Sequence, residues 1–152
     1  MFNADSLALS RDGKILYWQA LTGKTLYRLP TSAIQSAAAA GQARPEKVGT
    51  TEPVDGLWTG ENDEIYLSSI ADNAIKVINP VNGSVRQVLT DSRLRWPDTF
   101  SQGPDGAIYV TASHIQDSPW FHAAWTERNF ALFKFMPGEN NTVGSNRESN
   151  RQ

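Results

Sequence analysis

The most constraining feature of this sequence is a segment that occurs three times. Three stretches come into register when their central turns are aligned, namely DSLALSRDGKILYWQA at 5–20, DGLWTGENDEIYLSSI at 55–70 and DTFSQGPDGAIYVTAS at 98–113. Each begins with an aspartate seven residues before the turn, and the turns are 50 and then 43 residues apart. Self-similarity at such a period indicates a repeat architecture in which each copy is one supersecondary unit.

Each copy has the pattern of short antiparallel strands. A first strand, a tight turn and a β-rich second strand are followed by a third strand at 25–29, 74–78 and 131–135. Fourth strands are predicted at 46–50 and 84–90. Four short strands at this period are typical of β-propeller blades, and aspartates in register favour a propeller over a β-sandwich. We therefore predict an all-β fold of about three four-stranded blades.

The chain is predicted to form one repeat domain followed by a tail. Residues 1–136 form the partial propeller, with blades at 5–51, 52–91 and 92–136. The polar tail 137–152 is expected to be disordered, because it has few apolar residues to bury. The only helix is predicted in the alanine-rich stretch 31–44, with Thr31 or Ser32 as its N-cap.

About three blades are too few for a ring, since propellers carry roughly four to eight. The third copy also lacks a fourth strand before the polar tail. We expect the chain to be the C-terminal half of a propeller with exposed strand edges. Self-association, or pairing with a missing N-terminal half, would cover those edges.

Composition excludes some classes of partner. A net charge of −2 with 20% charged residues offers no basic surface for nucleic acid or a membrane. Cysteine is absent, which removes disulfides and thiolate metal sites and leaves the redox compartment open. The first residues lack the basic and apolar regions of a secretory signal, so the sequence assigns no localisation.

Several phrases in the repeats carry a resemblance to a known family. They are LALSRDGKILYWQALTGKTLYRLP at 7–30, EPVDGLW at 52–58, IADNAIK at 70–76, RWPDTF at 95–100 and AIYVTASHIQDSPWF at 107–121. These phrases resemble bacterial members of the major royal jelly protein/yellow family over roughly residues 5–136. The resemblance implies a six-bladed propeller, related in architecture to gluconolactonase and regucalcin, and a family that is usually exported. It also implies small-molecule binding, with dopachrome conversion among the known activities.

A propeller gathers candidate site residues at one end of its channel. The innermost strands line the channel, so the loops before them and the loops between second and third strands share one face. We assign candidate ligand-binding roles to a set of residues from these loops: Asp55, Asn73, Trp96, Gln116, Asp117, Trp120 and Phe121. The connection beginning at His114 is about twice as long as its counterparts and aromatic-rich, which is typical of functional loops.

Three functional hypotheses remain open. Proton transfer by Asp98 and His114 would support tautomerase-like or lactone-opening chemistry on a small molecule. A metal-dependent, lactonase-like hydrolase would use Asp55, Asp98 and Asn73 to bind a divalent cation such as Ca²⁺, which prefers oxygen ligands. The third hypothesis is a non-catalytic binding or scaffold module.

Structural roles compete with each of these hypotheses. An aspartate before a strand often accepts backbone hydrogen bonds in a turn, and this applies to Asp55 and to Asp5. A single histidine at a strand end is more often a hydrogen-bonded structural residue than a catalytic one, which applies to His114.

Overall fold

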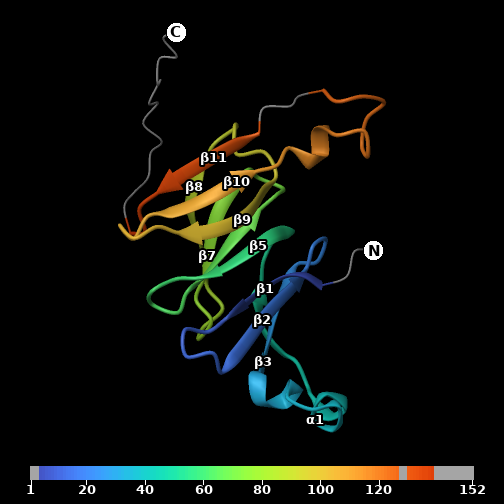
Figure 1. The fold of residues 1–152 in the computed structure, drawn as a ribbon, viewed down its shortest axis with the longest axis vertical. Helices are drawn as coiled ribbons and strands as arrows, with labels where there is room; N and C mark the ends of the chain where they lie inside the picture. The colour runs from blue at the N-terminus through green and yellow to red at the C-terminus, as the bar shows by residue number, and fades with distance from the viewer. Residues whose placement is uncertain (1–3, 127–129, 139–152) are drawn as a thin grey trace.

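The computed structural model describes residues 4–126 and 130–138, and Figure 1 shows their arrangement. Within these residues the chain forms three antiparallel sheets, one short α-helix and two turns of 3₁₀-helix. The prediction of an all-β fold with repeated antiparallel sheets and one short helix is confirmed. The predicted tail at 137–152 lies outside the described residues except for Pro137 and Gly138.

The first sheet has four strands in the order of the chain. They are β1 (Ala4–Leu9), β2 (Ile15–Ala20), β3 (Thr25–Pro30) and β4 (Glu46–Thr50). A 3₁₀ turn (Thr31–Ile34) and helix α1 (Ala37–Gln42) connect β3 to β4. The hydroxyl of Ser36 accepts the amide hydrogen of Ala39 at 3.1 Å and caps α1. The prediction of Thr31 or Ser32 as N-cap is wrong, because the continuous alanine run begins only after Ser36.

The second and third sheets repeat this arrangement. The second sheet contains β5 (Val54–Thr59), β6 (Ile65–Ser69), β7 (Ala74–Ile78) and β8 (Val85–Thr90). The third contains β9 (Pro97–Gln102), β10 (Ile108–Ala112) and β11 (Ala131–Phe135), with a 3₁₀ turn (Ile115–Asp117) after β10. Among the described residues the third sheet has three strands, in the order β11-β10-β9.

The turn between the first two strands has the same geometry in every sheet. Gly13, Asp63 and Gly106 occupy the same repeat position and have φ angles of 71°, 59° and 79°. Glycine adopts this left-handed conformation at no steric cost, and aspartate is among the few other residues that tolerate it. The repeat seen in the sequence therefore corresponds to three hairpins with matching turns.

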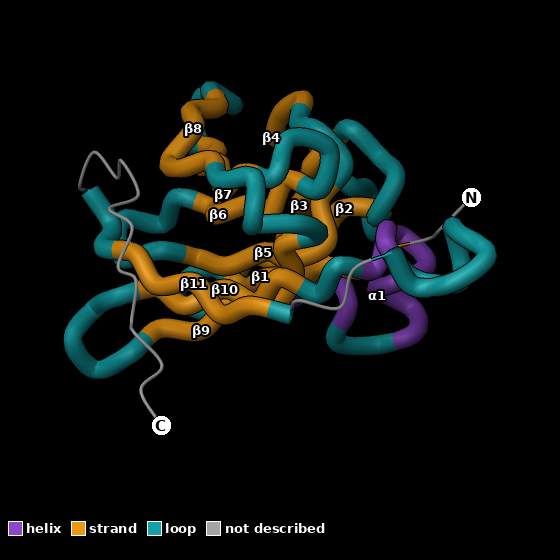
Figure 2. The backbone as a smooth tube through the Cα atoms, turned by 90° about the horizontal axis from the view of Figure 1, so that it is seen from above, coloured by secondary structure: helices purple, strands orange, loops and turns teal. Residues whose placement is uncertain are grey.

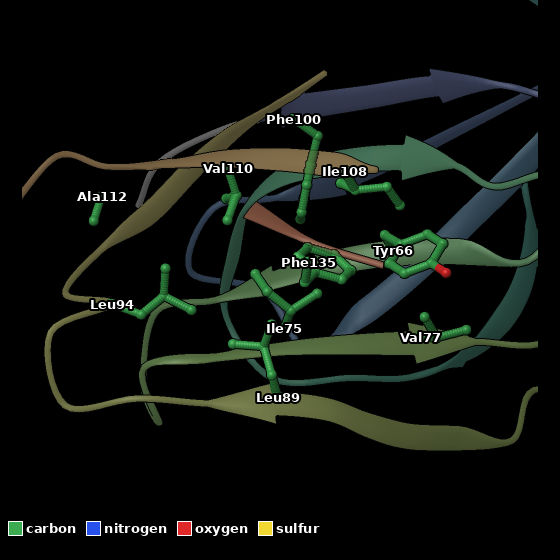
Figure 3. Close-up of a cluster of buried hydrophobic side chains, with 10 residues drawn as sticks. All are labelled: Tyr66, Ile75, Val77, Leu89, Leu94, Phe100, Ile108, Val110, Ala112 and Phe135. Carbon is green, nitrogen blue, oxygen red and sulfur yellow. The ribbon is translucent and has the colours of Figure 1, made fainter. Parts of the chain in front are cut away.

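Apolar side chains fill the two spaces between neighbouring sheets. One buried cluster includes Tyr17 and Leu26 of the first sheet together with Leu57 and Leu67 of the second. The other joins the second sheet to the third, and Figure 3 shows it around Phe135. Strand β6 is buried along its whole length because both faces of the middle sheet are covered.

The first strands of the three sheets, β1, β5 and β9, are the inner strands of the repeat, and β5 packs against both of the others. Strands β1, β5 and β9 are neighbours, although they belong to different sheets. Figure 2 shows the fourth strands β4 and β8 on the side away from β9. No helix in the described part of the chain is long and apolar enough to cross a membrane.

Candidate functional site

Each inner strand contains one extra residue at the position of its aspartate. In β1, Ala4 pairs with Ala20 and Ser6 pairs with Gln19, so Asp5 has no partner in β2. Such a β-bulge disrupts the ladder locally, re-aims a side chain, and is common beside active sites. The bulge therefore sets the direction of Asp5 independently of the regular alternation of the strand.

The other two inner strands have the same irregularity. Two residues face one in each case, Asp55-Gly56 opposite Ser68 in β5 and Asp98-Thr99 opposite Thr111 in β9. The hydroxyl of Ser68 accepts the Gly56 amide hydrogen at 2.6 Å, and that of Thr111 accepts the Thr99 amide hydrogen at 3.2 Å. These hydroxyls satisfy backbone donors that the bulge removes from the ladder, so the irregularity is built into the strand pairs.

The three bulged aspartates line one open pocket. Asp5, Asp55 and Asp98, with the residues that follow them, border a volume of about 300 Å³. The sequence predicted that Asp55 and Asp98 share one face of the domain, and both line this pocket. The bulges themselves were missed. Their signal is the spacing of buried residues, which is three in Val54–Leu57 and Pro97–Phe100 and not the two of a regular strand.

Close backbone contacts hold the inner strands together at the aspartates. A Cβ atom added to Gly56 would lie 1.8 Å from the carbonyl oxygen of Asp98, so β5 and β9 can approach this closely only with glycine at that position. The hydroxyl of Ser6 donates to the carbonyl oxygen of Asp55 and connects β1 to β5. A backbone contact and a side-chain hydrogen bond to the backbone therefore connect all three bulged strands.

Asp55 is held in an environment that disfavours its charge. Burial, with smaller contributions from the nearby carboxylates of Asp98 and Asp5, raises the pKa of Asp55 to about 6. A hydrogen bond from the indole nitrogen of Trp96 acts in the opposite direction. The group of like charges is therefore only partly compensated by the protein.

Trp96 links this pocket to the long connection after β10. Its backbone has a φ of 51°, and its carbonyl oxygen accepts the amide hydrogen of Ser113 at 3.0 Å. The indole N–H of Trp96 donates to Oδ2 of Asp55, while its ring packs against Phe121 with 5.8 Å between ring centroids. The predicted ligand residues Trp96, Phe121 and Asp55 therefore form one contiguous group.

His114 belongs to a separate, buried ion-pair network. Its side chain is 2% exposed and its Nδ1 lies 3.3 Å from Oδ2 of Asp117. Arg95 donates two hydrogen bonds to the same carboxylate, at 2.8 Å and 2.6 Å, and holds the pKa of Asp117 at about 2. Sequence reasoning did not identify Arg95, because nothing in the repeat marks a residue 22 positions from its partner.

The structure does not bring together every predicted site residue. Asp98 accepts a hydrogen bond from the hydroxyl of Thr99 at 3.0 Å, whereas His114 interacts with Asp117. Among the described residues no hydrogen bond or ion pair joins Asp98 to His114, so their acid–base pairing stays a prediction. Asn73 occupies the β6–β7 turn with a φ of 49°, a conformation that explains an asparagine there without a ligand.

The remaining predicted residues lie in the connection after β10. Trp120 and Phe121 are 82% and 53% exposed, an unusual position for large aromatic side chains. Oε1 of Gln116 is buried and has no hydrogen-bond partner in the described part of the chain. Asp117 is occupied by Arg95 and His114, which makes it a structural anchor.

No complete metal site is present in residues 4–126 and 130–138. Within them, no group of three or more histidine, aspartate or glutamate side chains is arranged to hold a metal ion. Asp55 and Asp98 nevertheless offer the oxygen donors that hard divalent cations prefer. Their electrostatic repulsion is an observation that fits partial ligation, since a cation would relieve it.

Comparison with known proteins identifies the architecture. The chain matches no family model and no curated protein. Solved structures similar in fold include a gluconolactonase from Xanthomonas campestris (13% identity, 88% of this chain and 44% of that chain, TM-score 0.64). A calcium-binding regucalcin from Agrobacterium tumefaciens matches at 17% identity over 86% and 44%, with a TM-score of 0.61.

A third similar structure belongs to a lyase. A catalytically inactive variant of virginiamycin B lyase from Staphylococcus aureus, solved with quinupristin, matches at 15% identity over 90% of this chain and 42% of that chain, with a TM-score of 0.57. The fold is that of a β-propeller. The chain spans less than half the length of these structures, so it corresponds to part of such a propeller.

The comparisons overturn the resemblance to the major royal jelly protein/yellow family. The similar structures are gluconolactonase- and regucalcin-like propellers and virginiamycin B lyase. The phrases that suggested the family fall on hairpins and inner strands, as in 7–30 and 95–100. Strand and turn requirements are shared by all propeller repeats, so such phrases are a weak basis for one family.

Proposed function

We propose that this chain supplies one half of the axial site of a metal-dependent, lactonase-like propeller hydrolase. The observation that carries this proposal is the alignment of Asp5, Asp55 and Asp98 at three equivalent bulges around one pocket. Similar folds described as gluconolactonase and regucalcin support the hydrolase over the tautomerase. Separate hydrogen-bond partners for Asp98 and His114 also weigh against proton transfer between them.

Asp55 and Asp98 are the residues of this chain that would hold the cation. The Trp96 indole engages Oδ2 of Asp55, which leaves Oδ1 for a ligand. Ca²⁺ takes about six to eight oxygen ligands, so further ligands would come from water, substrate or other blades. When bound, a divalent cation polarises a substrate carbonyl as a Lewis acid.

The chain's own residues would orient the substrate and set the local charge. Trp96 fixes the rotamer of Asp55 through its indole N–H, and the backbone contact between Gly56 and Asp98 fixes the two carboxyl groups relative to each other. In the reaction, water adds to the carbonyl carbon of a lactone, the ring C–O bond breaks, and the released alkoxide takes a proton. The product is the corresponding hydroxy acid.

Calorimetry of Ca²⁺ and Mn²⁺ binding tests the proposal on the full chain. We expect binding that weakens at least tenfold in Asp55→Asn and in Asp98→Asn. Asp105→Asn is the matched control, because Asp105 is an exposed turn aspartate paired with Lys134 at 2.7 Å. Equal binding by all four proteins, or none by the unmodified chain, would contradict the cation site.

Hydrolysis of a lactone panel separates the remaining alternatives. Turnover that needs both metal and Asp55 supports the hydrolase. Metal binding without turnover, in the presence of any complementary half, favours the non-catalytic binding module. Tautomerisation of dopachrome without metal would contradict the proposal.

A further inference from the structure

The connection after β10 forms a second pocket, whose lining residues differ from those around the axial aspartates. The corresponding connections in the other two sheets are short turns at 21–24 and 70–73. The third spans 113–130, and its described residues surround a pocket of about 320 Å³. The lining consists of five residues, Ile115, Ser118, Pro119, Trp120 and Trp125.

This pocket is built on an anchored loop. The Asp117 carboxylate accepts hydrogen bonds from Arg95 and from the hydroxyl of Thr126, the latter at 3.3 Å. The Thr126 amide also donates to the carbonyl oxygen of Asp117 at 3.1 Å, which closes the loop at its base. Between these anchors, the carbonyl of Ser118 accepts the amide hydrogen of Phe121 at 3.0 Å. The pocket therefore exists before any ligand binds, which limits the entropy lost on binding.

The chemistry of the lining selects an apolar occupant. Four of its five residues are apolar or aromatic. The exception is Ser118, whose hydroxyl already accepts the amide hydrogen of Trp120 at 3.3 Å. A polyhydroxylated sugar would lose hydrogen bonds to water here with few partners in exchange. An exposed tryptophan, in contrast, gains free energy when an apolar group covers it.

A chain of side-chain contacts connects this pocket to the axial aspartates. Trp120 lines it, its neighbour Phe121 packs on Trp96, and the Trp96 indole donates to Asp55. In Figure 1 the loop leaves the third sheet at the end of β10, where the antiparallel strand β9 begins. A ligand that spans the distance from Asp55 to Trp120 would place a polar group at the first and an apolar group against the second.

We propose that this pocket is a specificity subsite for the apolar part of the substrate. The substrate class is a lactone carrying an alkyl chain or aromatic ring of about one ring in size, in contrast to a sugar lactone. A volume near 320 Å³ is at the small end for ligand pockets, which fits a single substituent. The assignment of lactones rests on the proposed function, whereas the apolar subsite rests on Ile115, Pro119 and Trp120.

Two probes test the subsite independently of catalysis. The first is N-phenyl-1-naphthylamine, a neutral apolar fluorophore, titrated against the full chain. The second is the ratio of affinities for δ-decalactone, which carries a pentyl chain, and unsubstituted δ-valerolactone. We expect fluorophore binding in the micromolar range and an affinity ratio of at least tenfold in favour of δ-decalactone.

Trp120→Ala should abolish fluorophore binding and reduce the ratio to about threefold or less, because the ring forms one wall. Trp120→Phe should restore most of both signals, because a smaller aromatic ring still forms part of the wall. Tyr27→Ala is the matched control, an exposed aromatic on the first sheet that should change neither signal. Fluorophore binding that survives Trp120→Ala, or is lost in Tyr27→Ala, would overturn the subsite.

The outcomes distinguish the two proposals. If the fluorophore binds through Trp120 but Asp55→Asn leaves lactone binding unchanged, the subsite stands and the proposed function fails. If lactone binding depends on Asp55 but the pentyl chain adds nothing, the proposed function stands and the subsite is wrong. A dimer that disappears in Trp120→Ala, seen by light scattering, would mean that a second copy occupies the pocket, and would also overturn it.

Discussion

Asp117, which follows β10, and Asp55, in β5, show how differently the same kind of side chain can titrate in one protein. Asp117 is buried against the Arg95 guanidinium and its pKa falls to about 2. Asp55 is partly buried beside Asp98 and Asp5, and its pKa rises to about 6. The first charge is balanced within the chain and stabilises a loop. The second is left partly unbalanced, as expected of a group that binds something else.

Removing the balanced carboxylate should have the largest effect. Asp117→Asn keeps the shape of the side chain but leaves the Arg95 charge without its partner and weakens the bonds to Thr126 and His114. We expect the free energy of unfolding to fall by about 2 kcal/mol in urea denaturation. Asp105→Asn breaks an exposed ion pair with Lys134 and should change the free energy of unfolding little. Similar losses in the two variants would show that Asp117 is not an anchor.

Neutralising the unbalanced carboxylate of Asp55 should instead increase the free energy of unfolding. The folded pKa of Asp55, about 6, lies above the ordinary value of 3.8, so its stabilisation is complete below pH 3.8 and is lost as pH rises through 6. At pH 7 and without metal, the free energy of unfolding of Asp55→Asn should therefore be about 1 kcal/mol higher than that of the unmodified chain.

The pH dependence of unfolding sharpens the comparison. Between pH 5 and 7 the unmodified chain should lose stability while Asp55→Asn stays nearly constant. Below pH 3.8 both proteins should instead lose stability as the pH falls, because Asp117 becomes protonated toward its pKa of about 2. Parallel curves from pH 5 to 7 would refute the raised pKa of Asp55.

The smallest expected effect comes from the hydrogen bond that partly compensates Asp55. Trp96→Phe keeps an aromatic ring against Phe121 but removes the indole N–H that favours the charged carboxylate. The pKa of Asp55 should rise above 6, as measured from carboxyl ¹³C shifts. Trp58→Phe is the control, since its indole makes no hydrogen bond to Asp55. An unchanged or lower pKa in Trp96→Phe would contradict the role of the indole.

The fold could be predicted well from the sequence because the repeat consists of local strand and turn patterns. Alternating strand residues and left-handed turns at Gly13 and Gly106 depend on near neighbours, so they can be recognised without a structure. The three aligned aspartates likewise predicted that Asp55 and Asp98 would share one face. The same local patterns misled the assignment of a family, since other propellers must satisfy them too.

Contacts between distant residues limited the prediction of the site. The partner of Asp117 is Arg95, which lies before β9 and outside the repeated pattern. His114 turns away through a left-handed backbone with a φ of 52° and meets Asp117 three residues later. Sequence position placed His114 near Asp98, but the backbone conformation that sets the direction of its side chain could not be read from it.

Gly56, at the bulge of β5, limits which parts of this molecule can change their sequence without moving the strands. Because Gly56 lets β5 touch the main chain of Asp98, the two strands are in direct backbone contact at the aspartates. A side chain at position 56 would force the two strands apart, whereas substitutions in the loop at 113–126 leave this contact in place. Evolution could therefore reshape the loop at 113–126 to accept new molecules while the gap between the two carboxyl groups stays constant.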